Sequence, residues 1–263
     1  MGKPAGGECG AAGGGDLGHR AVRTVQRGGG IILDDVALSI EGRAVLAPLS
    51  LRLDEGRIGI VGRNGSGKTS LLRLIAGLQE PDRGRVTVGG VDMARDRAGA
   101  IRRLGILFQN PDHQIIFPTV EEEIAFGIRQ LGVPRDAARQ QAQAVLAAHG
   151  RADWASRSTQ ALSQGQRHYL CLMAVLAMAP DVILLDEPFT GLDLPTTMQL
   201  RRALDGLGQQ LVMVTHDPAL LAGYDRVLWL DEGRLQADGP AGAVLAAYTE
   251  RMTELGQEAP CWP

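Results

Sequence analysis

The chain of 263 residues contains few cysteines, few lysines and few aromatic side chains. Its three cysteines, Cys9, Cys171 and Cys261, are odd in number and far apart. This argues against a disulfide framework or a cysteine-rich metal cluster and is typical of a reducing compartment. A net charge of only -3 provides no bulk attraction for nucleic acid, so we expect no nucleic-acid partner.

Long hydrophobic runs are also missing from the sequence. The longest apolar run, residues 170–179, is about half of the ~20 residues that cross a bilayer, so it predicts a buried helix. If the protein serves a membrane process, we expect it to act from the cytoplasmic face of the cell membrane, through partner chains.

The sequence divides into three parts. Residues 1–30 are rich in glycine and lack any large apolar cluster, which predicts a disordered extension. Residues 31–253 carry alternating strand and helix patterns and predict one α/β domain, with a helix-rich insert at about 92–175. Residues 254–263 are expected to form a flexible tail.

Apolar runs and turn residues predict the elements of this domain. The expected strands are 31–40, 44–53, 57–61, 85–89, 105–108, 182–185, 211–215 and 226–230. The expected helices are 67–78, two within 119–149, 164–179, one that begins near Pro195, and 240–253. Thr119 and Glu122 have the spacing of a capping box at the start of the first helix of 119–149.

A glycine-rich loop between an apolar strand and an apolar helix fits the P-loop pattern. Its residues are Gly62, Arg63, Asn64, Gly65, Ser66, Gly67, Lys68, Thr69 and Ser70. The glycines let backbone N–H groups turn toward phosphate oxygens, and the next helix points its positive end at the same anion. Lys68 is expected to hold the phosphates and Thr69 to bind Mg²⁺. Lys3 and Lys68 are the only lysines, and a compact ammonium suits this loop better than a planar guanidinium.

Two carboxylates, Asp186 and Glu187, follow the apolar run 182–185. Ligands of parallel sheets bind at the carboxyl ends of the strands. We therefore expect Asp186 to hold Mg²⁺ and Glu187 to activate the attacking water as a general base.

Four further segments follow in a characteristic order. They are Gln109 after a strand (the Q-loop), residues 162–166 (Leu-Ser-Gln-Gly-Gln, the signature), residues 191–193 (Gly-Leu-Asp, the D-loop) and His216 after a strand. Together with the P-loop and the acidic pair, they resemble the ABC ATPase family over nearly all of residues 31–235.

This resemblance implies a P-loop NTPase core with a parallel sheet, an N-terminal antiparallel β subdomain and a helical subdomain that carries the signature. It implies ATP and Mg²⁺ as ligands, with Gln109 near Mg²⁺ and the water and His216 near the γ-phosphate. Ser163, Gly165 and Gln166 would complete the nucleotide pocket of another subunit, so a homodimer, or a heterodimer with a paralogous ATPase, is expected.

Two positions depart from the family pattern. Gln164 replaces the usual glycine of the signature. The family also stacks an aromatic ring on adenine from its first hairpin, but no aromatic residue precedes Phe108 here, and we expect Ile40 or a neighbour in that place. An aliphatic side chain lacks the stacking geometry of a ring, so weak discrimination between ATP and GTP is expected.

Within the family, residues 108–114 and 119–127 are most similar to energy-coupling-factor (ECF) ATPases, which drive vitamin and metal-ion uptake. The implied partners are a transmembrane coupling subunit, whose helix would enter a groove beside 119–127, and a substrate-binding membrane subunit. Residues 105–109, 171–178 and 225–230 are most similar to ATPases of biotin transporters, with cobalt or nickel import as the alternative.

Two other classes of P-loop protein fit the sequence less well. Soluble ABC ATPases of DNA maintenance carry long coiled coils, and those of translation carry two cassettes, neither of which this sequence contains. A P-loop kinase of small metabolites would leave the signature and Gln109 unexplained.

Overall fold

A computed structural model describes residues 30–258 of the chain. Except for Gly30, the predicted disordered extension lies outside these residues, as do residues 259–263. The predicted tail begins too early, because the last helix continues through residue 254 to Glu258.

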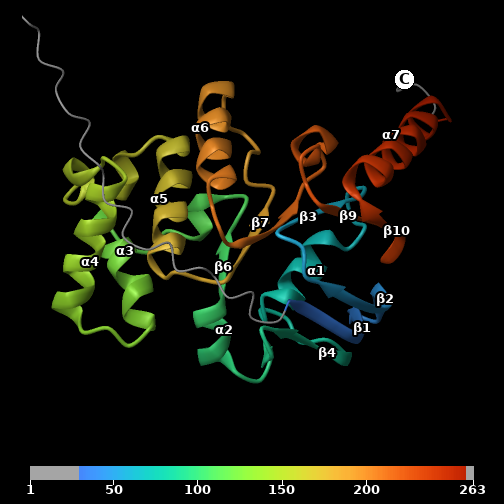
Figure 1. Ribbon diagram of the computed structural model, residues 1–263, viewed down its shortest axis with the longest axis horizontal. Helices are drawn as coiled ribbons and strands as arrows, with labels where there is room; N and C mark the ends of the chain where they lie inside the picture. Colours follow the sequence, from blue (N-terminus) through green and yellow to red (C-terminus); the bar gives the residue numbers. More distant parts are fainter. Residues whose placement is uncertain (1–29, 259–263) are drawn as a thin grey trace, which may run out of the picture.

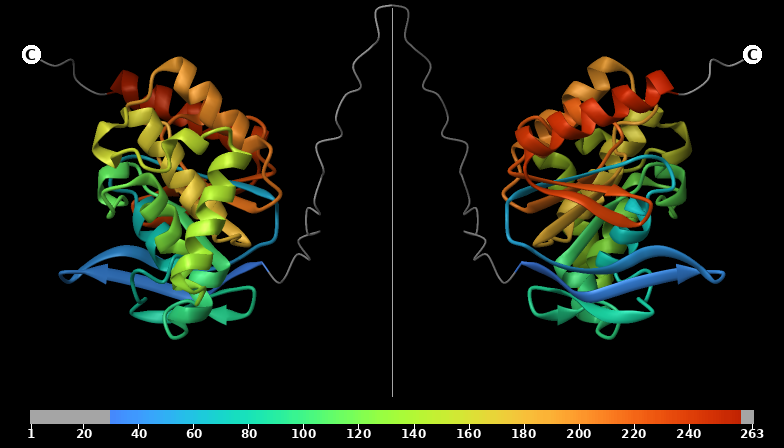
Figure 2. Two further views of the ribbon diagram at one scale, coloured as in Figure 1. Left: turned by 90° about the vertical axis from the view of Figure 1, so that its left-hand side faces the viewer. Right: turned by 90° about the vertical axis from the view of Figure 1, so that its right-hand side faces the viewer.

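Two sheets form the body of the fold (Figure 1). The first is antiparallel, in the order β2-β1-β4-β5, and lies along the lower side of the molecule in both views of Figure 2. Its strands are β1 (Ile31–Ile40), β2 (Arg43–Leu53), β4 (Arg83–Val88) and β5 (Val91–Asp92). This sheet is the antiparallel subdomain that the family resemblance implies.

The second sheet is six-stranded, in the order β10-β9-β3-β8-β7-β6, and is parallel except for β10. Its strands are β3 (Arg57–Val61), β6 (Leu104–Leu107), β7 (Val182–Asp186), β8 (Gln210–Val214), β9 (Arg226–Asp231) and β10 (Arg234–Pro240). The inner strands β3, β7 and β8 are buried apolar runs, as expected for strands covered on both faces. β10 was missed because this edge strand has no buried residue to mark it.

The described residues form seven α-helices. They are α1 (Lys68–Ile75), α2 (Arg97–Arg103), α3 (Val120–Gln130), α4 (Arg135–Ala148), α5 (Gln164–Ala177), α6 (Leu194–Asp205) and α7 (Ala241–Glu258). Short 3-10 turns are η1 (Pro111–His113), η2 (Ala152–Trp154), η3 (Thr159–Ala161) and η4 (Pro218–Leu221). Helix α2, capped by Asp96, was not predicted.

The helical part of the molecule is made by α3, α4 and α5, at the left of Figure 1. Its core includes Ile124, Ala138, Leu146 and Leu170. The predicted insert at 92–175 begins too early, because β6 lies inside that range and belongs to the six-stranded sheet. Thr119 does cap α3 by accepting from the Glu122 N–H, but the Glu122 carboxylate accepts from the Thr119 hydroxyl rather than from its backbone, so the predicted box is incomplete.

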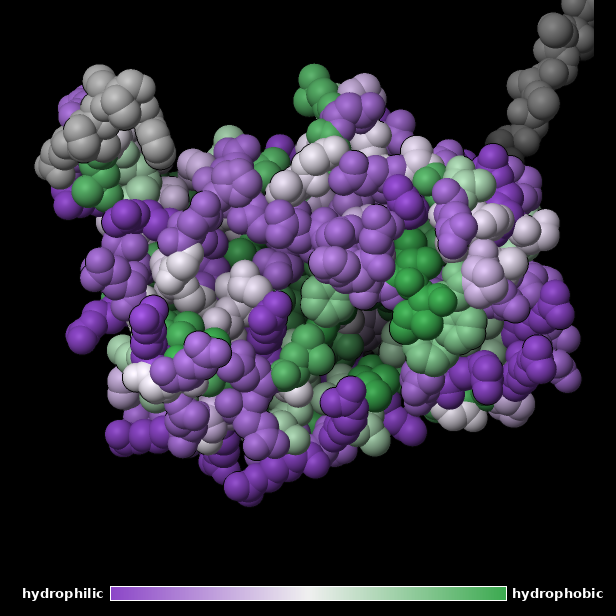
Figure 3. All heavy atoms as spheres, turned by 180° about the vertical axis from the view of Figure 1, so that it is seen from behind, coloured by the Kyte–Doolittle hydropathy of each residue, from purple (hydrophilic) through white to green (hydrophobic). Residues whose placement is uncertain are grey.

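The exterior is mixed. No helix within residues 30–258 is long and apolar enough to cross a membrane. Figure 3 shows that hydrophilic side chains dominate the back of the molecule, with hydrophobic side chains gathered in patches near its middle. Residues 170–177 of the apolar run lie in α5, where Leu170, Cys171, Leu172, Met173 and Val175 are buried.

Backbone hydrogen bonds join three segments around the loop after β3. The Gly233 N–H, in the turn between β9 and β10, donates to the Ser66 carbonyl at 3.1 Å, and the Gly233 carbonyl accepts from the Ala47 N–H at 2.9 Å. A Cβ on Gly67, where φ is 98°, would lie 2.9 Å from the Val45 carbonyl oxygen. Only glycine fits this close approach. The start of β2, the loop 62–70 and the β9–β10 turn are therefore packed backbone to backbone.

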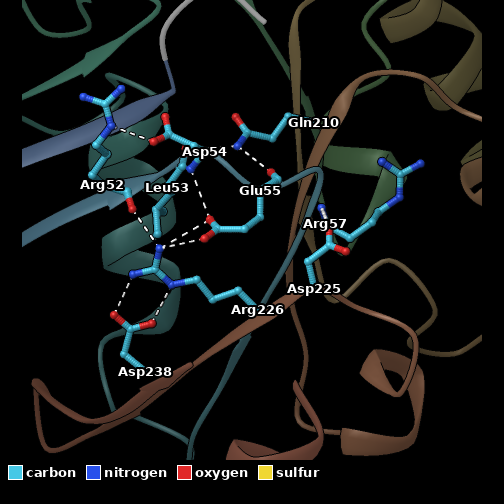
Figure 4. A network of polar contacts seen from close by, with 9 residues as sticks. All are labelled: Arg52, Leu53, Asp54, Glu55, Arg57, Gln210, Asp225, Arg226 and Asp238. Atoms are coloured by element: carbon cyan, nitrogen blue, oxygen red, sulfur yellow. Dashed lines mark hydrogen bonds and ion pairs between the residues drawn. The ribbon is translucent and has the colours of Figure 1, made fainter. Parts of the chain in front are cut away.

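A polar network joins the two sheets on the opposite side from that loop (Figure 4). The Arg226 guanidinium donates to both oxygens of Asp238, at 2.6 and 2.7 Å, and also to Glu55 and the Arg52 carbonyl. Its side chain is only 19% exposed, and the hydrogen bonds to Asp238 raise its pKa above the ordinary value. Bidentate pairing of this kind is strong and geometrically specific.

We predict that Arg226→Ala lowers the free energy of unfolding by about 2 kcal/mol, because it leaves the half-buried carboxylates of Asp238 and Glu55 unpaired. Urea unfolding followed by circular dichroism measures this change. Arg52→Ala is the matched control, since its ion pair with Asp54 is exposed and its removal should leave the midpoint unchanged. Equal midpoints for the two variants would contradict the prediction.

Candidate nucleotide-binding site

Four parallel strands of the six-stranded sheet end at one cavity of about 790 Å³. β3 is followed by the loop 62–70, β6 by Gln109, β7 by Asp186 and Glu187, and β8 by His216. The predicted residues that line this cavity are Gly62, Arg63, Asn64, Gly65, Ser66, Gly67, Lys68, Thr69, Ser70, Gln109, Asp186, Glu187 and His216. The structure therefore brings together residues that are up to 154 positions apart, from Gly62 to His216.

Lys68 lies at the first position of α1 and is 7% exposed. Its ammonium group donates to the carbonyl oxygens of Gly62 and Arg63, both at 2.8 Å. Burial lowers the pKa of Lys68, while the charges of Glu187 and Asp186 raise it. The ammonium group is thus held in the loop by two carbonyl acceptors. Phosphate oxygens of a ligand can replace these carbonyls as its hydrogen-bond acceptors.

The loop also contains a buried hydroxyl without a partner. Ser66 is 2% exposed, and its Oγ atom makes no hydrogen bond within the described residues. A buried polar atom in this position is costly unless it is satisfied. A phosphate group bound in the loop would accept a hydrogen bond from this hydroxyl. The loop is therefore suited to a polyphosphate.

Asp186 and Glu187 place two carboxylates side by side at the end of β7. Burial raises the pKa of Asp186, and the charge of Glu187 raises it further. The charges of Arg73 and Lys68 and a hydrogen bond with Thr69 act in the opposite direction. The carboxylate and the Thr69 hydroxyl are the oxygen ligands that Mg²⁺ prefers.

The structure adds a contact that the sequence did not indicate, between Glu187 and His216. His216 Nδ1 lies 2.7 Å from Glu187 Oε2. Because an ionised carboxylate only accepts, Nδ1 carries the hydrogen of this bond. Glu187 has a left-handed backbone with φ 49°, and its N–H donates to the Val214 carbonyl at 3.0 Å. This strained conformation turns the side chain from β7 toward the end of β8.

Three predicted residues do not line this cavity. Ser163, Gly165 and Gln166 lie at the start of α5, where Ser163 caps the helix. The Ser163 hydroxyl accepts from the Gln166 N–H at 3.3 Å, and the Gln166 side chain accepts from the Ser163 N–H at 3.0 Å. The hydroxyl hydrogen of Ser163 is not used in this capping box, so it is available to a ligand outside the helix.

Two lining residues were missed by the sequence analysis, Val45 and Tyr248. Val45 belongs to β2, whereas Ile40, which was expected beside the base, lies at the end of β1, 43% exposed, and does not line the cavity. Tyr248 comes from α7 and packs edge-on against Trp229 with ring centroids 5.6 Å apart. No motif surrounds Tyr248, so only the docking of α7 reveals it.

Comparisons with known proteins give a consistent result. The family model described as ABC transporter matches residues 46–190. The biotin transport ATP-binding protein BioM of Rhodobacter capsulatus is 57% identical, over 88% of this chain and 99% of that protein. BioM of Rhizobium etli is 40% identical, over 84% of this chain and 98% of that protein.

Solved structures with the same fold include cbiO1 from Clostridium perfringens, part of the ABC transporter complex cbiONQ. It is 27% identical, with a TM-score of 0.70 over 86% of this chain and 95% of that one. A dimeric ATP-binding cassette in a post-hydrolysis state with ADP and Pi is 24% identical, with a TM-score of 0.69 over 80% of this chain and 98% of that one, which supports the fold alone.

The family match covers more than half of the chain, and curated relatives align over nearly their whole length. The expected fold class is confirmed by the two sheets and by the solved neighbours. On these grounds the chain belongs to the ABC transporter family.

Proposed function

We propose that this chain is the ATP-hydrolysing subunit that energises an ECF-type ABC importer, with biotin as the imported solute. The observation that carries the proposal is the single cavity in which Lys68, Gln109, Glu187 and His216 meet at the ends of four parallel strands. The likeness to two proteins named for biotin transport supports the choice of solute.

In the proposed reaction the loop 62–70 holds the phosphates of ATP. Lys68 Nζ exchanges its carbonyl partners for phosphate oxygens, and Ser66 Oγ gains a partner. Glu187 accepts a proton from water, the water oxygen attacks the γ-phosphorus, and the bond to the bridging oxygen breaks, which releases ADP and phosphate. Catalysis comes mainly from positioning and charge stabilisation.

His216 and Gln109 set the geometry of this water. The hydrogen bond from His216 Nδ1 to Glu187 Oε2 orients the carboxylate. To donate to the γ-phosphate at the same time, the ring must also carry a hydrogen on Nε2, since Nδ1 is engaged. Gln109 faces the same cavity from the end of β6.

The donor set suits Mg²⁺ beside the phosphates. Thr69, Asp186 and Gln109 would hold it, and no cluster of three or more acidic, histidine or cysteine side chains that could hold a metal is found among residues 30–258. Mg²⁺ is usually held by one or two protein oxygens, substrate phosphates and water rather than by such a cluster. When bound, it would neutralise negative charge on the phosphates.

Two chains would pair head to tail. Ser163, Gly165 and Gln166 lie away from the cavity of their own chain, and the N-terminus of α5 is suited to an anion. Placed over the γ-phosphate of a second chain, they would close its pocket. A homodimer, or a heterodimer with a paralogous ATPase, gives each nucleotide both halves of a site.

The membrane partners would bind the helical part. A groove of about 320 Å³ runs beside α3, lined by Phe117, Phe126 and Ala125 together with Glu122 and Arg129. The opposite side of α3 is buried in the helical core, so the helix both packs and forms the groove. We assign this groove to a helix of the transmembrane coupling subunit, with a separate membrane subunit that binds the solute. The chain would then lie at the cytoplasmic face of the cell membrane.

We predict that Glu187→Gln still binds ATP but hydrolyses it about 100-fold or more slowly, because the amide cannot accept the proton of water. The variant should accumulate as an ATP-dependent dimer in size-exclusion chromatography. A phosphate-release assay measures the rate. Hydrolysis close to the wild-type rate would remove Glu187 from the role of base.

From the first hairpin only the aliphatic Val45 lines the cavity, and the ring of Tyr248, from α7, is packed edge-on against Trp229. Weak base discrimination is therefore expected. The ratio of kcat/KM for ATP over GTP should therefore be below about tenfold. Steady-state hydrolysis with each nucleotide gives this ratio, and Val45→Tyr should raise it by supplying a stacking ring. A wild-type preference above tenfold would show that another group selects adenine.

The proposal as a whole is tested by uptake of labelled biotin in cells that co-express this chain with a coupling subunit and a biotin-binding membrane subunit. Wild-type chain should stimulate uptake, whereas Lys68→Ala should not, because the loop loses its ammonium group. If the wild type hydrolyses ATP with the partners present but uptake is not stimulated, biotin is the wrong solute. Cobalt and nickel are then the solutes to assay.

A further inference from the structure

A fully buried histidine outside the nucleotide cavity connects two parts of the site. His168 lies in the second turn of α5 and is 0% exposed. Its Nε2 atom is 3.2 Å from the carbonyl oxygen of Gln109, and its Nδ1 atom is 3.2 Å from the carbonyl oxygen of Gln164. The imidazole thus lies between the signature and the Q-loop, which are more than 50 residues apart in the sequence.

The two carbonyl groups differ in whether they have a hydrogen-bond donor other than the His168 ring. Within α5, the Gln164 carbonyl faces the backbone N–H of His168, as in any α-helix. The Gln109 carbonyl belongs to no helix or strand, and within residues 30–258 His168 is the only group that hydrogen-bonds to it. Since a carbonyl only accepts and a neutral imidazole has one N–H, we assign that hydrogen to Nε2.

The Q-loop is held on its other side by β6. The Gln114 side chain accepts from the Phe108 N–H at 3.2 Å and donates to the Ile106 carbonyl at 3.2 Å. Arg167, the neighbour of His168, pairs with Asp112 at 3.2 Å. The backbone of Gln109 therefore lies between an anchor on the sheet and an anchor on α5.

The two ends of this connection face different ligands. Gln109 lines the nucleotide cavity of its own chain, whereas Ser163 does not. Ser163 lies five residues before His168, about 7.5 Å along the helix axis. In the head-to-tail dimer proposed above, on which this inference rests, Ser163 faces the nucleotide of the partner.

We propose that His168 is a positioning residue that ties the Gln109 backbone to α5 and thereby couples the two nucleotide sites of the dimer. When Gln109 shifts toward the nucleotide of its own chain, it moves the start of α5 in that chain, which faces the nucleotide of the partner. Coupling between two sites gives a Hill coefficient above 1 and at most 2 for hydrolysis against ATP concentration.

Two variants of similar size separate the hydrogen bond to the Gln109 carbonyl from the contact with the Gln164 carbonyl. The side-chain amide nitrogen of glutamine reaches about as far as Nε2 of histidine, and that of asparagine about as far as Nδ1. His168→Gln therefore keeps the bond to Gln109, whereas His168→Asn places its amide beside the Gln164 carbonyl and loses the bond to Gln109. We expect His168→Gln to retain the wild-type Hill coefficient and His168→Asn to lower it to about 1.

A control is His149→Ala, which removes the 2.9 Å contact between His149, directly after α4, and the Tyr169 hydroxyl of the same α5 helix without touching the Q-loop. Its Hill coefficient should stay at the wild-type value. Equal Hill coefficients for the Gln and Asn variants of His168 would overturn the proposal, as would a wild-type value of 1.

A test of the dimer itself separates a failure of the head-to-tail pairing from a failure of the role of His168. If Glu187→Gln forms no dimer with ATP, the head-to-tail pairing fails, and the coupling fails with it. If that dimer forms and His168→Asn keeps wild-type cooperativity, only the role of His168 is overturned.

A measurement on the wild-type dimer covers the case in which His168→Asn does not fold. Amide hydrogen exchange should slow over residues 108–110 and 164–168 at the same concentration of a non-hydrolysable ATP analogue. Slowing confined to 108–110 would show that the Q-loop moves without α5 and would overturn the proposal.

Discussion

The Lys68 ammonium group is the charge around which the nucleotide site is arranged. It lies between two loop carbonyls, at 2.8 Å from each, and within the field of Asp186 and Glu187. A buried cation is stable only with such partners, and two adjacent carboxylates are tolerated only near such a cation. The loop conformation, the end of β7 and the start of α1 therefore depend on one another, and the phosphates of a nucleotide enter an arrangement already balanced for charge.

The residues of the cavity could be predicted because they follow local patterns. The loop 62–70, the acidic pair and His216 each stand directly after an apolar strand, and parallel strands bring their carboxyl ends together. Residues that reach the cavity from other elements follow no local sequence pattern and could not be predicted. Tyr248 depends on how α7 packs against β9, and Val45 depends on the close approach of β2 to Gly67.

Errors at element boundaries have similar causes. β10 alternates exposed and half-buried residues at a sheet edge, so it lacks the apolar run that identified β3 and β7. α2 is short, and its start is set by the Asp96 side chain, which accepts from the Gly99 N–H at 2.8 Å. The insert starts later than predicted because β6, a strand that the sequence did indicate, pairs with β7 in the six-stranded sheet before the chain enters the helical part.

The contacts among β2, the loop 62–70 and the β9–β10 turn limit where the molecule can bend. Gly233 is hydrogen-bonded to both Ser66 and Ala47, and Gly67 has no room for a side chain against Val45. The antiparallel sheet and the phosphate loop therefore behave as one rigid body. A hinge for any closure around a nucleotide would therefore have to lie outside this body.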